Sequence, residues 1–156
     1  MKLSGSAGRS VDLATRTATL ADSKTGRSMR PLSHAACSIL SSLSRTSELV
    51  FSSGKTGKAL TGYRSSWDRI VRLAVLPGDV TLHVLRHSFA STAAELDYSE
   101  LTIAALIGHK SGSITSLYVH HADATLLAVA DAVADEIARR MGDKKPSGDV
   151  IELRRA

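Results

Sequence analysis

The spacing of apolar residues changes at residue 33, and this change decides the fold class. Residues 17–32 alternate small or apolar residues with polar ones around a Ser-Lys-Thr-Gly turn, which is the pattern of a β-hairpin with Lys24 at its tip. From Ser33, which can cap a helix, apolar residues recur at the helical period. The sequence therefore predicts a mainly α fold of the α+β class, with one small antiparallel β-sheet near the N-terminus.

Six helical segments are predicted after the hairpin. In chain order they span residues 33–43, 61–74, 82–96, 99–108, 113–120 and 123–141, with Ser99 and Asp123 as further caps and Gly108 as a stop. The residues that share one face of their helix are Ala36, Ile39, Leu40 and Leu43; Tyr63, Trp67, Ile70, Val71 and Ala74; Leu85, Phe89 and Leu96; and Leu126, Ala130, Val133, Ile137 and Met141. We expect the last two sets to be buried, and Tyr63 to pack beside Trp67.

Length and cysteine content predict one domain in a reducing compartment. With 156 residues the chain can bury a single core, and Cys37 is its only cysteine, so no intrachain disulfide is possible. No stretch approaches the roughly 18 apolar residues of a membrane span. We expect a soluble, cytoplasmic domain over residues 1–142, without a membrane partner, and a polar tail over residues 143–156 that acts as a mobile extension or an exchange segment.

The positive charge of the chain is concentrated in its first half. Net charge is +5, but residues 1–72 hold 12 Lys and Arg against 4 Asp and Glu, while residues 73–156 hold 8 against 11. Cations gathered beside a polyanion gain free energy by releasing its condensed counterions, so this half is a candidate surface for duplex DNA. Charge alone also suits many soluble proteins that bind no nucleic acid. The candidate DNA-binding residues are Arg27, Arg30, Lys55, Lys58, Arg64 and His87.

Three motifs follow one another in a fixed order. They are His83-Val-Leu-Arg86-His87, then Leu106-Ile-Gly108-His109, then Thr115-Ser-Leu-Tyr118-Val-His120. With a lysine in an upstream hairpin turn and a tyrosine nine residues after the Gly-His histidine, the chain resembles the tyrosine recombinase (phage integrase) family from about Val11 to Met141. The resemblance implies the catalytic-domain fold of that family and site-specific DNA recombination.

The resemblance also implies a role for each matched residue. Tyr118 would be the nucleophile that forms a 3′-phosphotyrosyl bond with DNA. Arg86 and His83 would hold the phosphate, since residues three apart share a helix face and a guanidinium suits two oxygens. His109 would donate a hydrogen bond near the phosphate, and Lys24 would be the general acid at the leaving oxygen. Such chemistry needs no cofactor and no metal, and its partners would be double-stranded DNA and further copies of the chain, as a tetramer on paired sites.

Several features depart from the pattern or compete with it. The family's other catalytic arginine lies on a helix well upstream, and Arg9 stands too close to Lys24 to replace it, so we expect a chain truncated at its N-terminus and nearly inactive alone. Two alternatives stay open, a non-catalytic DNA-binding fragment and a type IB topoisomerase-like enzyme that relaxes DNA. A phosphate-binding loop at Gly54-Lys55-Thr56 is disfavoured because Leu49 replaces a required glycine, and a zinc-protease helix because Val84 replaces the glutamate.

Overall fold

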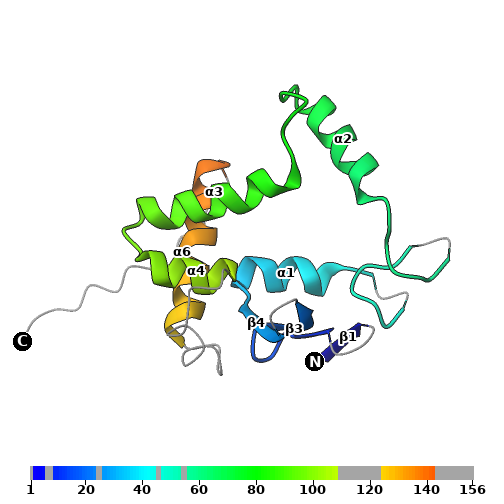
Figure 1. Ribbon diagram of the computed structural model, residues 1–156, viewed down its shortest axis with the longest axis horizontal. Helices are drawn as coiled ribbons and strands as arrows, with labels where there is room; N and C mark the ends of the chain where they lie inside the picture. Colours follow the sequence, from blue (N-terminus) through cyan, green and yellow to red (C-terminus); the bar gives the residue numbers. More distant parts are fainter. Residues whose placement is uncertain are drawn as a thin grey trace, which may run out of the picture.

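The computed structural model describes residues 2–5, 9–23, 26–44, 47–53, 56–108 and 124–142 (Figure 1). Four strands precede the helices. The elements are β1 (Lys2–Gly5), β2 (Arg9–Asp12), β3 (Thr17–Ser23), β4 (Gly26–Pro31), α1 (His34–Ser42), α2 (Tyr63–Leu73), α3 (Leu82–Glu95), α4 (Glu100–Ile107) and α6 (Ala124–Arg140). The predicted class, mainly helical with a small antiparallel sheet, is confirmed.

The four strands form one antiparallel sheet in the order β1-β2-β3-β4. The predicted hairpin of residues 17–32 is β3 and β4, in which Thr17 pairs with Pro31 and Ala18 with Arg30, and its register shifts between Leu20 and Ser23. The β2–β3 turn forms because the Asp12 carboxylate accepts hydrogen bonds from two backbone N–H groups within three residues. These bonds lower the pKa of Asp12.

Local capping chemistry sets the ends of two helices as predicted. The Ser33 hydroxyl accepts from the Ala36 N–H at 3.1 Å, and the Ser99 hydroxyl accepts from the Thr102 N–H at 3.2 Å. Gly108 ends α4 in the left-handed region, with φ 71°, which a residue without a side chain adopts at little cost. The predicted segment 113–120, the Asp123 cap and the tail over residues 143–156 lie outside the described residues.

The core lies where α3, α4 and α6 meet. In Figure 1, α6 crosses α3 and α4, while α1 and the sheet lie beside α4 and α2 stands apart. The buried apolar cluster consists of Ala93, Leu106, Val129, Ala130 and Val133, with Phe89, Tyr98, Ile103, Leu126 and Ile137 packed against it. The predicted burial of the apolar face of α6 is therefore confirmed for the residues in the middle of the helix. The small residue Ala93 is completely buried, which allows α3 to approach α6 closely.

Some of the expected burial is wrong. Leu85 is 54 % exposed, Leu96 36 % and Met141 74 %, so the ends of the predicted stripes lie at the surface. On α3 the buried residues are instead Thr92 and Ala93. The reason is that α3 packs on α4 and α6, and the core residues that it contributes, Phe89 and Ala93, lie in its second half.

Helix α2 is joined to the rest of the domain mainly through its C-terminal half. Val71 is its buried residue, and the Trp67 indole N–H donates to the Val80 carbonyl at 2.8 Å, which ties α2 to the loop that leads into α3. Tyr63, expected to pack beside Trp67, is 61 % exposed. Across the described ranges, no helix is both long enough and apolar enough to cross a membrane.

Candidate active site

The His83-x-x-Arg86 motif lies on the first two turns of α3, which begins at Leu82. The imidazole rings of His83 and His87 are perpendicular, with their centres 4.7 Å apart, because residues four apart lie on one side of a helix. Both histidines are exposed and Arg86 is half-buried. Since the same turns carry the positive end of the helix dipole, an anion bound here is favoured both by the side chains and by the backbone.

A second arginine, Arg30 of β4, reaches the end of α4. Its Nη1 donates to the Met29 carbonyl at 3.0 Å and its Nη2 to the Gly108 carbonyl at 3.4 Å. A Cβ at position 108 would overlap this guanidinium, so glycine is needed there for space as well as for its φ. The sheet is thereby joined to the turn that precedes His109 in the chain.

The surroundings of Arg30 disfavour its charged form. Burial lowers the pKa of Arg30, and the charge of Arg86 lowers it further. Neither guanidinium forms an ion pair with a carboxylate among the described residues. The end of β4 and the start of α3 therefore each carry a half-buried cation without a described acidic partner, which suits an anionic ligand.

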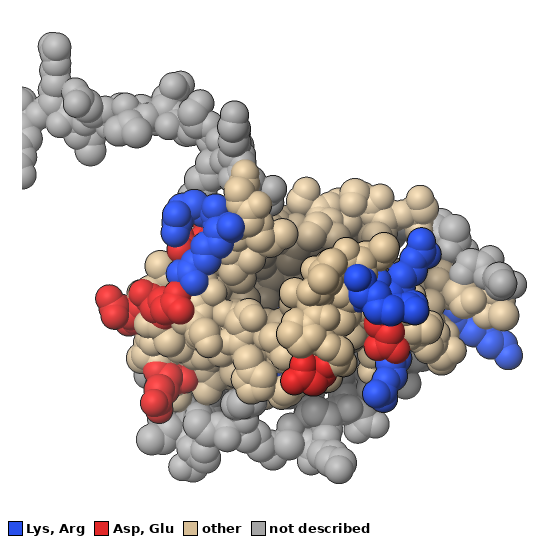
Figure 2. All heavy atoms as spheres, turned by 90° about the horizontal axis from the view of Figure 1, so that it is seen from above, with Lys and Arg blue, Asp and Glu red and all other residues tan. Residues whose placement is uncertain are grey.

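The other predicted site residues are only partly described. Lys24, His109, Tyr118 and Lys55 lie outside the described residues, and of Arg27 only the backbone is described. Lys58, in the loop before α2, and Arg64, on α2, are exposed. On the face seen in Figure 2, Lys and Arg form separate groups beside acidic residues rather than one continuous basic patch. Of the predicted residues, the structure places His83, Arg86 and His87 on the first two turns of α3, and Arg30 at the end of α4.

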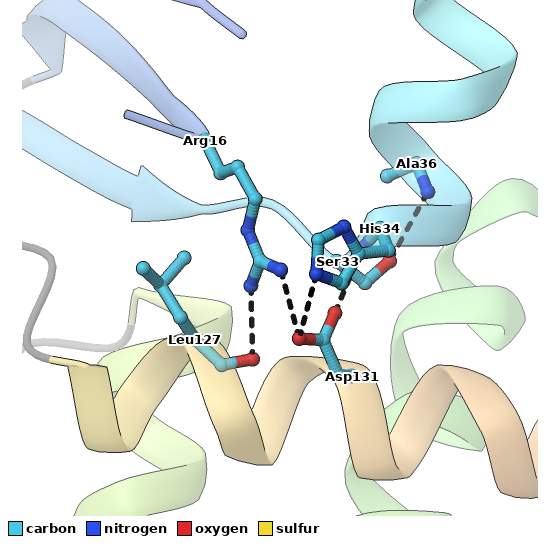
Figure 3. Close-up of polar contacts among 6 residues, drawn as sticks. All are labelled: Arg16, Ser33, His34, Ala36, Leu127 and Asp131. Atoms are coloured by element: carbon cyan, nitrogen blue, oxygen red, sulfur yellow. Dashed lines mark hydrogen bonds and ion pairs between the residues drawn. The ribbon is translucent and has the colours of Figure 1, made fainter. Parts of the chain in front are cut away.

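One polar cluster was not anticipated from the sequence, and it fixes the hairpin to the helical core (Figure 3). The Asp131 carboxylate on α6 accepts from Arg16 Nη1 at 2.8 Å and from the His34 backbone N–H at 2.7 Å. Arg16 also donates to the Leu127 carbonyl at 3.3 Å. Burial acts to raise the pKa of Asp131, but the bonds from His34 and Arg16 and their charges outweigh it and lower that pKa.

This cluster fixes the position of the sheet relative to the helices and takes no part in the proposed chemistry. Arg16 ends the β2–β3 turn, so its ion pair with Asp131 holds the start of β3 on α6. Arg30 of the neighbouring strand β4 reaches the end of α4. No pattern in the sequence marks it, because Arg16 and Asp131 are 115 residues apart. Within the described ranges, no three His, Cys, Asp or Glu side chains gather as metal ligands.

Comparison with known proteins identifies the family of the chain. Residues 7–125 match the phage integrase family. The match covers well over half of the chain, so the protein belongs to the phage integrase family of tyrosine recombinases, whose general activity is site-specific DNA recombination by breaking and rejoining DNA. Neither the search of curated proteins nor the search of solved structures found a match.

Proposed function

We propose that this chain carries the active site for strand exchange, and that Tyr118 cuts one DNA strand and remains attached through a 3′-phosphotyrosyl bond. The observation that supports the proposal most is the position of His83 and Arg86, three residues apart, on the first two turns of α3. The matched range 7–125 includes all five proposed catalytic residues, Lys24, His83, Arg86, His109 and Tyr118.

The proposed chemistry follows from what a phosphodiester requires. The Tyr118 oxygen bonds to phosphorus as the bond to the 5′ oxygen breaks; the phenol releases its proton to water, and Lys24 supplies one to the leaving oxygen. A phenol has a pKa of about 10, so nearby cations must stabilise the developing phenolate. Arg86, His83 and His109 neutralise charge on the non-bridging oxygens. The new ester conserves the bond energy, so rejoining requires no nucleotide.

The wider surface would hold the duplex without reading its sequence. Lys58 and Arg64 are exposed, and together with Arg27, Lys55 and His87 they are the proposed phosphate contacts. The logarithm of the affinity should therefore fall linearly with the logarithm of the salt concentration, with a slope set by the number of phosphates that are neutralised. In the working state we propose a homotetramer on paired sites, in which residues 143–156 dock on a neighbouring copy.

The proposal can be tested without knowing the target sequence. The chain, expressed with any coding sequence that precedes Met1, is incubated with nicked duplexes of randomised sequence, which trap the covalent intermediate, and adducts are counted on denaturing gels. The unchanged protein and the control Tyr63→Phe, which alters an exposed tyrosine on α2, should form adducts.

Tyr118→Phe should bind DNA and form no adduct. An adduct that persists in Tyr118→Phe would show that Tyr118 is the wrong nucleophile. DNA binding without any adduct in the unchanged protein would favour the non-catalytic DNA-binding alternative.

A further inference from the structure

One side chain of α2 holds the end of the loop that leads into α3. The Trp67 indole N–H donates to the Val80 carbonyl at 2.8 Å, and both residues are half-buried. In Figure 1, α2 stands apart from the other helices, and the loop over residues 74–81 leads from it to α3. Among the described residues, no other hydrogen bond joins α2 to residues 77–81, so this bond is the link between α2 and the end of the loop.

The start of α3 lacks the side-chain cap that holds many helix ends. Thr81 occupies the N-cap position, but its hydroxyl accepts no hydrogen bond from the backbone of the helix. Helix ends fray where the first N–H groups have no side-chain partner. The Val80 carbonyl that Trp67 holds lies one residue before this position. The bond from α2 therefore restrains the first turn of α3, where no cap does so.

This turn carries the residues that are proposed to hold the phosphate. His83 follows the first residue of α3, and Arg86 lies one turn later. The Val84 N–H closes the turn on the Thr81 carbonyl at 2.9 Å, and the centres of the His83 and His87 rings are 4.7 Å apart. If the turn frays, both contacts are lost and His83 moves relative to a bound phosphate. Misplacement of a catalytic group by about 1 Å can cost about 10²-fold in rate.

We propose that Trp67 is a positioning residue of the active site, which acts through the Val80 carbonyl to hold the first turn of α3 in the orientation that DNA cleavage requires. The reaction that it serves rests on the proposed function, whereas the restraint on the first turn of α3 does not. The indole touches neither DNA nor the reacting atoms. The competing role is purely structural: the bond stabilises the fold and leaves the geometry of His83 and Arg86 unchanged.

Replacement of one ring group separates the two roles, because the chain contains a single tryptophan. β-(3-Benzothienyl)alanine at position 67 has sulfur in place of the N–H and keeps the size of the ring, whereas 5-fluorotryptophan keeps the N–H. Tyr63→Phe is the control for a change elsewhere on α2. The protein, with any coding sequence that precedes Met1, is mixed with saturating nicked duplex. The rate of adduct formation in a single turnover and the affinity for the duplex are measured separately.

A positioning role predicts a loss of rate without a loss of binding. At a temperature where circular dichroism shows both proteins folded, the sulfur isostere should form adducts about 10–100-fold more slowly than the unchanged protein. Its affinity should change by less than about twofold, because contacts to phosphates spread over the surface dominate binding. The 5-fluorotryptophan protein and Tyr63→Phe should keep the rate. An unchanged rate in the isostere, or a rate that falls only as far as the affinity, would overturn the proposal.

Trp67→Phe is the second variant should the isostere not fold, since it also lacks the N–H, and the same two measurements decide. A further measurement needs no activity. The ring protons of His83 and His87 are shifted by each other's ring, and their nuclear magnetic resonance signals are assigned with His83→Gln and His87→Gln. In the isostere both signals should move towards that of His34, whose side chain is 79 % exposed.

The histidine signals separate failure of the two proposals. Signals that stayed in place in the isostere would show that the first turn of α3 does not depend on the Trp67 bond and would overturn the proposal. If the signals moved but the unchanged protein formed no adduct, the proposed function would fail, while the restraint of α3 by Trp67 would stand.

Discussion

Removal of the Asp131 carboxylate should strongly destabilise the fold. In Asp131→Ala the Arg16 guanidinium, whose side chain is 14 % exposed, loses its counter-ion, and the His34 N–H loses its acceptor. Breaking a fully buried ion pair costs about 3–5 kcal/mol, whereas an exposed pair is worth about 0.2–1 kcal/mol. The Asp131 side chain is 27 % exposed, so the change should cost about 2–3 kcal/mol, between these limits.

Urea unfolding, followed by far-ultraviolet circular dichroism, measures this cost. Asp68→Ala is the matched control, since Asp68 is exposed on α2, and it should change the free energy of unfolding by less than about 0.5 kcal/mol. Adding Arg16→Met to Asp131→Ala removes the uncompensated charge, so the double variant should be more stable than the sum of the single losses predicts. A cost below about 0.5 kcal/mol for Asp131→Ala would refute the reasoning.

Three further predictions concern stability. Gly108→Ala should cost about 1–2 kcal/mol in thermal unfolding, because alanine is strained at φ 71° and would displace Arg30; an unchanged melting temperature would contradict this. The pKa of Asp131 is lowered in the folded state, so the ionised carboxylate stabilises the fold at pH values above the unfolded pKa of 3.8, and this stabilisation is lost as the pH falls through the folded pKa. The free energy of unfolding of Asp131→Asn should therefore depend less on pH in the acid range than that of the unchanged protein. Trp67→Phe, which removes the donor to the Val80 carbonyl, should cost about 1–2 kcal/mol in urea, and equal stability would exclude a structural role for that bond.

What the sequence predicts well is chemistry that acts over a few residues. Ser33 and Ser99 cap helices because each hydroxyl meets an N–H three residues ahead, and Gly108 ends α4 because glycine tolerates a left-handed backbone. The hairpin of residues 17–32 is of the same kind, since the alternation and the turn lie within one short segment. The order of the motifs around Arg86 and Gly108 can likewise be recognised in the sequence. The family match confirms the family that this order indicates.

Burial and long-range contacts are less predictable. Leu85 lies on a correctly predicted helix yet is exposed, and Met141 is exposed just after the end of α6, because burial depends on which other element covers a residue. The Arg16–Asp131 pair has no sequence pattern at all. The sequence indicates Arg30 by its charge alone, whereas its contact with Gly108 depends on the packing of β4 against α4.

The account depends most on Tyr118 as the attacking group, and peptide mapping of the trapped adduct tests this directly. The chain has three tyrosines, and trypsin separates them, because Tyr118 lies on the peptide from Ser111 to Arg139 while Tyr63 and Tyr98 lie on others. After nuclease digestion of the adduct, mass spectrometry should find the nucleotide phosphate on the Ser111–Arg139 peptide. A nucleotide on the peptide that contains Tyr63 or Tyr98 would contradict the assignment.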